Sequence, residues 1–270
     1  MSESLSPARA AWLAGQRRAS RRVWFLRAAL LVAFFAGWEL AARTGLMDPF
    51  IFSCPSRMWE TFIGLLSSGD LFLHIGVSVG ETVIGFLCGT LLGTAIATLL
   101  WWSDLLSRVL DPYLVVLNAL PKTALGPIFI VWMGAGGGAI IAMTLAISLI
   151  VTVLDMYAGF RETDRDRIRL LRTLGASRRQ VFTHLVLPSS FPTLASVLRV
   201  NVGLSWVGVI MGEFLVSRHG LGYLIVYGSQ VFRMDLVMTT VLILAAAAAL
   251  MYQGVLGLEK ALKKYMGVTV

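Results

Sequence analysis

Four ionisable residues, Glu81, Lys122, Arg199 and Glu213, lie inside otherwise apolar stretches of this chain. A charge at the centre of a bilayer costs about 2.5–3.5 kcal/mol on insertion scales, so such residues are candidates for ion pairing or for a solute pathway. At about 1.5 Å of rise per helical residue, Glu81, Lys122 and Arg199 come out near mid-membrane. We expect them to form a structural ion-pair cluster, or to attract an anionic solute through their one excess positive charge.

Glu213 lies near the outer end of its stretch and precedes Gly220-Leu-Gly222. It is expected either to shape an outer gate or to cap a helix end. No enzyme motif is present: the chain lacks GxxxxGK[ST], HExxH and GxSxG, and its three histidines are scattered. Cys54 and Cys88 are poorly placed to pair and have no partner at metal-ligand spacing. We therefore expect no catalytic site, no metal and no cofactor bound by this chain.

Membrane-spanning helices must position these residues, because the chain has too few polar residues to cover a water-facing globule. It is 57% hydrophobic and 14% charged, with a mean hydropathy of +0.78, whereas soluble domains average about 25% charged residues. One domain is the simplest organisation for 270 residues. A bilayer core needs about 20 mostly apolar residues per helix. Six stretches qualify: Trp24–Ala42, Phe72–Trp102, Tyr113–Met133, Ala139–Tyr157, Ser189–Val216 and Leu236–Leu256.

The first stretch has the shape of a cleaved signal peptide, since a basic segment precedes an apolar run. Its apolar run carries Glu39 and has no clear small-residue cleavage site. A retained transmembrane helix is therefore the favoured interpretation.

The lysines and arginines between the six stretches indicate the topology. With the N-terminus inside, the cytoplasmic segments hold 16 of them and the outer segments hold 4. This asymmetry is the positive-inside pattern of membrane proteins. It predicts that both termini are cytoplasmic, and it explains the net charge of +8 without a nucleic-acid partner.

Two features predict how the helices pack. Gly85, Gly89 and Gly93 recur every four residues, so they form a stripe on which another helix can approach closely. In the third stretch, Asp111-Pro112 is expected to start the helix, while Pro121 and Pro127 are expected to kink it. Such kinks are tolerated in membranes where protein or a water-lined cavity satisfies the freed carbonyls.

The segment from Arg161 to Pro188 is the one long polar island in the chain. It predicts two short helices outside the bilayer, joined at a Gly-Ala corner, with Gly175 in the left-handed conformation and Pro188 ending the second helix. Two pairs, Thr163 with Asp166 and Ser177 with Gln180, have the spacing of a capping box. On the first helix, one face carries Ile168, Leu171 and Leu174, and another carries Arg165, Arg169 and Arg172. Such a helix is expected to dock a partner.

Three classes of function fit these features. An importer driven by a separate ATPase would use the polar island as the ATPase contact, because this chain has no phosphate loop of its own. An ion-coupled secondary transporter would work without an ATPase, although no internal repeat of the kind common in that class is evident. A membrane scaffold or sensor would bind a partner without moving a solute.

The island resembles the EAA loop in the membrane subunits of binding-protein-dependent ABC importers. The resemblance runs from Leu171-Arg-Thr-Leu-Gly-Ala-Ser177 to Leu185-Val-Leu-Pro188, and Gly175, Leu185, Leu187 and Pro188 match the family spacing. The Glu-Ala-Ala positions fall on Arg169, Leu170 and Leu171, so a basic residue replaces the family's acidic one.

Further blocks over roughly residues 37–260 resemble the nitrate/sulfonate/taurine permease group. They are Gly37-Trp-Glu-Leu40, Cys54-Pro-Ser56, Leu120-Pro-Lys122 with Pro127, Trp132-Met-Gly134, and Glu213 with Gly220-Leu-Gly-Tyr223. The resemblance implies a nitrate-, sulfonate- or taurine-like solute. Taurine and sulfonate members tend to carry Arg where this chain has Glu81. Pro121-Lys122 and Glu213-Phe214 look more like relatives that carry pyrimidine-type thiamine precursors or riboflavin. A solute of that second kind is the alternative.

The resemblance implies an all-α membrane protein with the type I importer fold, six transmembrane helices and both termini cytoplasmic. Residues 1–23 would be a basic tail, 24–71 the first span and outer loop, 72–258 the transmembrane domain with its coupling loop at 161–188, and 259–270 the second tail. The ATPase-coupling residues would be Ile168, Arg169, Leu171, Arg172, Leu174, Gly175, Ala176, Ser177 and Pro188. The path or gate residues would be Glu81, Pro121, Lys122, Pro127, Arg199 and Glu213.

The resemblance also implies the partners and the location. Two ABC ATPase subunits, carrying the ATP and Mg²⁺, would bind two permease copies, expected to be a homodimer. An extracytoplasmic substrate-binding protein would dock outside. The assembly would lie in the lipid bilayer of a bacterial inner membrane.

Overall fold

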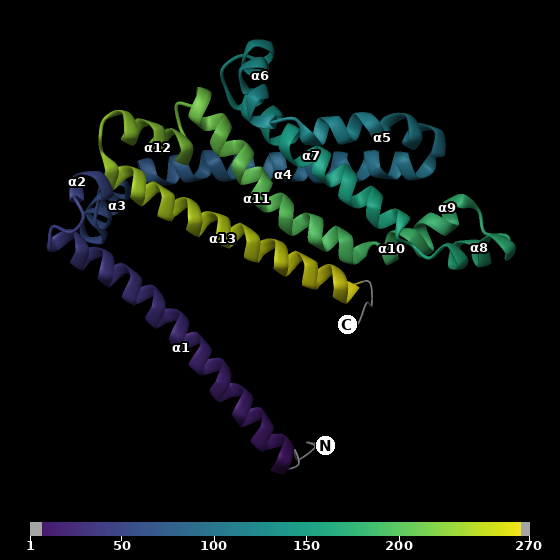
Figure 1. The fold of residues 1–270 in the computed structure, drawn as a ribbon, viewed down its shortest axis with the longest axis horizontal. Coiled ribbons are helices and arrows are strands. Elements are labelled where there is room, and N and C mark those ends of the chain that lie inside the picture. Colours follow the sequence, from purple (N-terminus) through teal and green to yellow (C-terminus); the bar gives the residue numbers. More distant parts are fainter. Residues whose placement is uncertain (1–6, 266–270) are drawn as a thin grey trace.

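The long apolar stretches fold as helices, because lipid offers no hydrogen-bond partner to the backbone. The computed structural model describes residues 7–265, and over that range it contains helices and no strand (Figure 1). The all-α fold class is thus confirmed. The helices are α1 (Pro7–Arg43), α2 (Pro49–Phe52), α3 (Pro55–Ser68), α4 (Asp70–Trp102), α5 (Asp104–Ala119), the 3₁₀ helix η1 (Lys122–Leu125), α6 (Gly126–Met133), α7 (Gly137–Arg161), α8 (Arg165–Thr173), α9 (Arg178–Val181), the π-helix η2 (Phe182–Val186), α10 (Leu187–Ser189), α11 (Phe191–Val216), α12 (Leu221–Gln230) and α13 (Met234–Tyr265).

Five predicted spans are single helices that are long and apolar enough to cross a membrane, namely α1, α4, α7, α11 and α13. The third span is different, because α5 and the η1–α6 pair meet at 89°. The expected kinked helix is therefore a broken one. Leu120 has an extended backbone (ψ 137°), as sterics favour for a residue before proline, and Pro127 starts α6.

The start of the third span was also predicted wrongly. Helix α5 begins at Asp104, and the Ser103 side chain accepts a hydrogen bond from the Leu106 amide at 3.2 Å. Pro112 lies inside the helix. An earlier, better cap therefore overrides the Asp111-Pro112 signal.

Helices α4, α7 and α11 form the centre of the bundle, and α13 and α12 pack against α11 (Figure 1). The predicted glycine stripe on α4 faces α7, where a Cβ on Gly93 would come within 2.6 Å of the Thr152 Cβ. Between α7 and α11, a Cβ on Gly208 of α11 would lie 2.5 Å from the Thr144 Cα. Small residues therefore bring the three backbones into close contact.

Asn201 ties these three helices together inside the bundle. Its Nδ2 donates to the Thr90 hydroxyl of α4 at 2.9 Å and to the Thr152 hydroxyl of α7 at 2.7 Å. Thr152 in turn donates to the Ser148 carbonyl at 2.8 Å. This polar network is completely buried.

The short helices gather at the two ends of the bundle. Helices α2, α3 and α12 lie at one end, while α8, α9 and the C-terminal end of α13 lie at the other (Figure 1). At the first end, Glu39 of α1 accepts hydrogen bonds from the Ser56 amide and from Arg43, at 3.0 and 2.7 Å. A carboxylate thus stabilises the start of α3. The cytoplasmic location of both termini stays a prediction, with which this arrangement is compatible.

Candidate functional site

The predicted docking segment is present as α8 and α9 at one end of the bundle. Helix α8 starts differently from the prediction: Asp164 caps it by accepting from the Asp166 amide at 2.8 Å. The expected Thr163–Asp166 capping box is wrong, because the Thr163 hydroxyl instead hydrogen-bonds to the Ser189 hydroxyl at 3.0 Å. That bond joins the two ends of the segment.

The Gly-Ala corner after α8 is a Schellman motif, in which two amides return to carbonyls of the last turn. The Ala176 amide donates to the Leu171 carbonyl and the Gly175 amide to the Arg172 carbonyl, both at 3.0 Å. Gly175 has φ +86°, a conformation that glycine adopts freely and most L-residues adopt only with strain. The predicted role of Gly175 at the corner is confirmed.

The second half of the segment begins as predicted and ends differently. Ser177 and Gln180 form the expected capping box, with bonds of 3.3 and 2.8 Å. Pro188 does not end the helix, because the chain continues through α9, η2 and α10. The Leu187 amide bonds to the Phe182 carbonyl, five residues back, and this widened turn leaves room for the proline ring.

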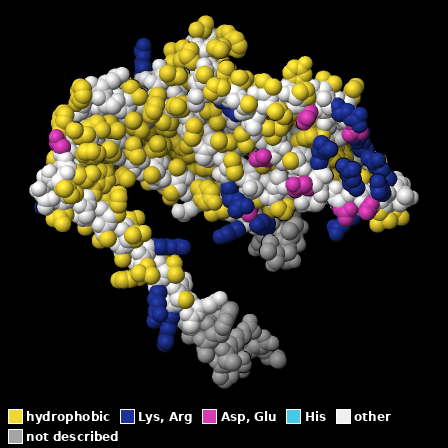
Figure 2. Space-filling model, viewed as in Figure 1, with side chains coloured by type: hydrophobic (Ala, Val, Ile, Leu, Met, Phe, Trp, Pro, Cys, Tyr) yellow, Lys and Arg dark blue, Asp and Glu magenta, His cyan; other side chains and the backbone are white. Residues whose placement is uncertain are grey.

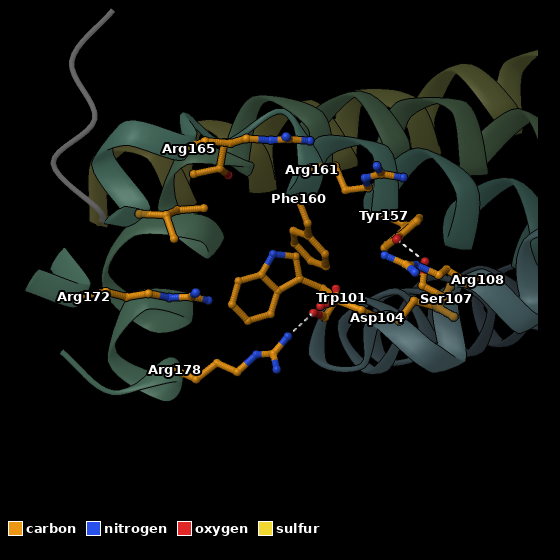
Figure 3. Close-up of a pocket in the computed structure, with 13 residues that line it drawn as sticks. Trp101, Asp104, Ser107, Arg108, Tyr157, Phe160, Arg161, Arg165, Arg172 and Arg178 are labelled. Carbon is orange, nitrogen blue, oxygen red and sulfur yellow. Dashed lines mark hydrogen bonds between the residues drawn. The ribbon is translucent and has the colours of Figure 1, made fainter. Parts of the chain in front are cut away.

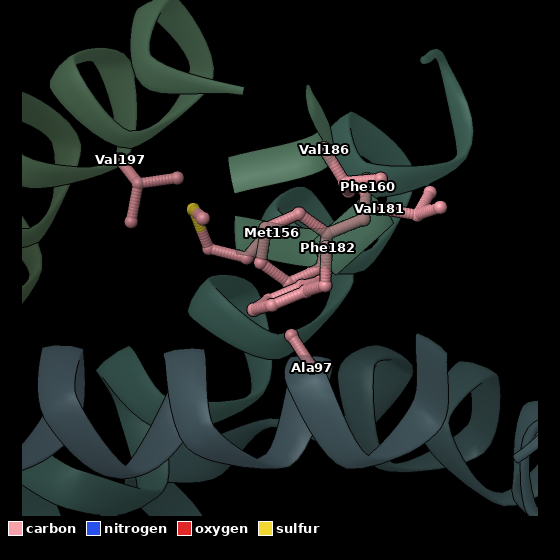
Figure 4. Packing of buried hydrophobic residues seen from close by; sticks show 7 residues of the cluster. All are labelled: Ala97, Met156, Phe160, Val181, Phe182, Val186 and Val197. Atoms are coloured by element: carbon pink, nitrogen blue, oxygen red, sulfur yellow. The ribbon is translucent and has the colours of Figure 1, made fainter. Parts of the chain in front are cut away.

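A buried cluster holds the segment on the bundle (Figure 4). Val181, Phe182 and Val186 are buried against residues of α4, α7 and α11, and Ile168, Leu171 and Ala176 pack against the same cluster. The Ser190 hydroxyl also donates to the Gly159 carbonyl at 3.1 Å. The segment is therefore fixed to the ends of α7 and α11.

The outward face of α8 carries Leu170 and Leu174, whose exposed fractions are 60% and 75%. Of the three predicted apolar anchors, Ile168 and Leu171 face the bundle and Leu174 faces outward. The sequence analysis missed Leu170, although its i, i+4 spacing from Leu174 was a usable signal. Arg169 is exposed and pairs with Asp166 at 3.1 Å, whereas Arg172 lines a pocket between α8 and the bundle.

The expected cluster of Glu81, Lys122 and Arg199 is not formed. The Lys122 ammonium donates to the Asn118 carbonyl at 2.9 Å, and Arg199 pairs with Glu259 of α13 at 3.6 Å. One carboxylate oxygen of Glu81 is buried with no hydrogen-bond partner among the described residues. The break at Pro121 moves Lys122 onto η1, and Arg199 finds a nearer carboxylate on another helix.

Glu213 is 1% exposed and caps α12. It accepts from the Ser78 hydroxyl and from the Gly222 amide, both at 2.5 Å. The Leu221 amide donates to Ser78 at 2.7 Å. The carboxylate therefore satisfies the free amides at a helix start, as expected from the cap alternative. Within residues 7–265 there is no group of three or more His, Cys, Asp or Glu that could hold a metal ion.

The bundle has several helices that are long and apolar enough to cross a membrane, and comparison with known proteins identifies its class. Residues 85–266 match the family described as the binding-protein-dependent transport system inner membrane component. The chain belongs to this family. It is thus the permease subunit of an ABC importer and a multi-pass membrane protein, and it is not an enzyme, because the ATPase activity lies in a separate subunit.

Two relatives and one solved structure illustrate the match. The chain is 31% identical to the formylaminopyrimidine transport permease protein ThiX of Halalkalibacterium halodurans, over 69% of this chain and 74% of that one. It is 28% identical to the putative aliphatic sulfonates transport permease protein SsuC of Bacillus subtilis, over 91% and 89%. A chain of a bacterial ABC transporter involved in the import of the acidic polysaccharide alginate superposes with a TM-score of 0.63 at 15% identity, over 91% and 98%.

The solved structure supports the type I importer fold. Family membership also favours the importer over the ion-coupled transporter and the scaffold considered above. Homologous importers work with ATPase and substrate-binding partners.

Proposed function

We propose that two copies of this permease form the path for a small solute and that each copy takes one ATPase subunit at its α8–Gly175–α9 segment. A substrate-binding protein delivers the solute from outside, to the end that carries α2, α3 and α12. The ATP and Mg²⁺ belong to the ATPase subunits. The setting is a bacterial inner membrane, as the family description implies.

One observation carries this proposal: the segment has an apolar face turned outward and a second face fixed to the bundle. Leu170 and Leu174 are exposed, and they offer an apolar contact to a cleft in the ATPase. The Schellman corner at Gly175 leaves open space beside its backbone, since a Cβ there would meet nothing within 4 Å. A partner can therefore approach the corner closely.

The same attachment gives a route for force. The segment is continuous with α7 at one end and with α11 at the other, and its core residues are buried against both. When ATP binding closes the ATPase dimer, the two segments move together and carry α7 and α11 with them. The broken α5–η1–α6 element is where the access to the path changes. Such a switch needs contacts that differ between the two states.

The solute is a small nitrate-, sulfonate- or taurine-like compound, and the sulfonate permease is a relative over most of this chain. The formylaminopyrimidine permease, at 31% identity, supports the alternative of a pyrimidine-type thiamine precursor or riboflavin. Calorimetry on the partner binding protein with taurine, an alkanesulfonate, nitrate, formylaminopyrimidine and riboflavin decides between them. Tight binding of formylaminopyrimidine or riboflavin, and of none of the other three, would refute the nitrate-, sulfonate- or taurine-like solute.

The ATPase contact is tested by co-purifying the permease with its ATPase in detergent. Changing both Leu170→Asp and Leu174→Asp should abolish the association, because it places two charges in an apolar contact. The matched control is Leu46→Asp, since Leu46 is 83% exposed in the loop after α1. The proposal fails if the double variant keeps the ATPase as well as the control does.

A further inference from the structure

A cavity of about 290 Å³ lies between the inward face of α8 and the ends of α4, α5 and α7. Five arginines line it: Arg108 of α5, Arg161 of α7, Arg165 and Arg172 of α8, and Arg178 of α9. We call the α8–Gly175–α9 segment the coupling segment. In Figure 3, Arg165, Arg172 and Arg178 lie on the side of this segment, and Arg108 and Arg161 lie on the side of α5 and α7. Figure 2 shows the wider gathering of Lys and Arg at this end of the molecule.

The described residues balance only part of the positive charge of this arginine pocket. Among the described residues, none of its five arginines forms an ion pair with a carboxylate. Asp104 is the one acidic side chain in its lining. Five cations placed around one small cavity repel each other, so the pocket is arranged for an anion that accepts several hydrogen bonds.

Aromatic side chains hold two of these arginines in place. The Arg178 guanidinium lies 5.5 Å from the Trp101 ring and 6.0 Å from the Trp102 ring, and it donates to the Trp101 carbonyl at 3.1 Å. The Arg161 guanidinium lies 5.7 Å from the Tyr157 ring, and the Tyr157 hydroxyl is hydrogen-bonded to Ser107. The orientation of these guanidinium groups is thus partly fixed before any ligand arrives.

The position of the pocket indicates that such an anion would come from the lipid headgroup region. It lies where the span α4 ends, at Trp101 and Trp102, and where α5 begins. Tryptophan and tyrosine are typical of the level of lipid headgroups. Directly beside it, α5 presents exposed Leu105 and Val109, an apolar surface along which acyl chains can lie.

The pocket and the ATPase contact use different faces of α8. Arg165, Ile168 and Arg172 follow i, i+3, i+7 spacing and face the cavity. Leu170 and Leu174 lie on the other side of the helix. A ligand in the pocket would therefore lie behind the ATPase contact and would not compete with it.

We propose that the arginine pocket binds the headgroup phosphate of an anionic phospholipid from the adjacent leaflet. The phosphate oxygens accept from the guanidinium groups of α5, α7 and α8, so one lipid links the coupling segment to the bundle. Arginine suits this role because its planar fork donates two bonds to a phosphate at once. Basic pockets of this kind on the cytoplasmic side of membrane helices bind such headgroups.

The test uses the full-length permease with its ATPase in nanodiscs that contain phosphatidylglycerol and phosphatidylcholine. Native mass spectrometry measures the phosphatidylglycerol that stays bound, as a function of its fraction in the nanodisc. The variant R108Q/R161Q removes two pocket arginines that lie outside the ATPase contact. Its apparent Kd for phosphatidylglycerol should rise at least about tenfold, because each lost charge-assisted bond weakens the site.

The matched control is R167Q/R179Q, which removes the same charge from exposed arginines of α8 and α9 outside the pocket. It should leave the apparent Kd within about twofold of the wild type. A second variant, Asp104→Asn, should lower the Kd, because it removes the one acidic group in the lining. Misfolding cannot produce this gain in affinity.

Three results would overturn the proposal. The first is equal retention of phosphatidylglycerol and phosphatidylcholine by the wild type. The second is equal loss of phosphatidylglycerol in R108Q/R161Q and R167Q/R179Q, since that would indicate a general surface charge effect. The third is binding of inorganic phosphate, titrated in lipid-free detergent, that phosphatidylglycerol does not displace, since the ligand would then be a soluble ion.

Discussion

Replacing Gly175 by valine tests whether the corner conformation sets the geometry of the ATPase contact. At φ +86° an L-residue pays about 1–2 kcal/mol, and a β-branched one is restricted further. The Cβ itself adds no steric cost, because at this position it meets no atom within 4 Å. The chain can relieve the strain by giving up the Ala176–Leu171 and Gly175–Arg172 hydrogen bonds, which would move the neighbouring Leu174.

The loss of ATPase affinity follows from this strain. Because 1–2 kcal/mol of strain disfavours the docked corner, the apparent Kd for the ATPase rises by up to about 5- to 30-fold. The measurement is a titration of purified ATPase against the permease in nanodiscs. Gly175→Asn should bind the ATPase nearly as well as the wild type, because asparagine tolerates the left-handed region.

The control for the valine side chain itself is Gly64→Val in α3. Gly64 also has open space around it, and its φ is not in the left-handed region. This variant should leave the ATPase affinity unchanged. The reasoning is refuted if Gly175→Val binds the ATPase normally, or if Gly175→Asn is as defective as Gly175→Val.

Three further predictions concern the stability of the bundle, each measured by the free energy of unfolding in a mild detergent titrated with a denaturing one. Gly208→Val should destabilise the protein by about 1–3 kcal/mol, because its Cβ would lie 2.5 Å from the Thr144 Cα. Gly203→Val on the same helix should be tolerated, because a Cβ there meets nothing within 4 Å. Equal effects of the two variants would contradict the packing described above. Glu213→Ala should lower the free energy of unfolding by about 1–3 kcal/mol, since it leaves the buried donors of α12 and Ser78 without an acceptor. Glu213→Gln should lower it less, because glutamine keeps one acceptor oxygen. An alanine variant as stable as the wild type would argue against the cap. Asn201→Leu should lower the free energy of unfolding by about 1 kcal/mol, because two interhelical hydrogen bonds at about 0.6 kcal/mol each are lost. A more stable variant would show that the Asn201 network does not stabilise the bundle.

The five unbroken spans and the close-packed stripe on α4 could be predicted from the sequence because both are local properties. A run of apolar residues predicts a helix wherever it lies, and Gly85, Gly89 and Gly93 mark one face by spacing alone. The Gly175 corner and the Ser177 cap are equally local, since each depends on residues within one turn. These predictions were confirmed.

Three of the errors arose where a residue distant in sequence decided the outcome. Thr163 was taken for a cap, but Ser189 is available to its hydroxyl once the segment folds back. Arg199 was assigned to a mid-membrane cluster, but its partner Glu259 lies on α13. The angle at Pro121 likewise depends on where α6 can lie, and proline content predicts a break without its size.

The arginine pocket beneath α8 could not be predicted from the sequence either. Arg108 and Arg161 contribute to it from α5 and α7, and nothing in their local sequence separates them from the other arginines counted toward the predicted topology. The folded arrangement alone brings them to Arg172. By contrast, the outward position of Leu170 followed from helical spacing and could have been inferred.

The π-helical turn before Pro188 has a consequence for how the coupling segment is oriented. A π-turn holds one residue more than an α-turn, and each residue of an α-helix rotates the chain by about 100°. The turn at Phe182–Val186 therefore offsets α9 from the axis of α11 by one residue of helical phase. If that turn tightened to an α-turn, α8 and its leucines would swing around the end of α11 while every helix kept its length. The direction in which Leu170 and Leu174 point thus depends on the backbone winding of five residues, of which Phe182 and Val186 are buried against the bundle.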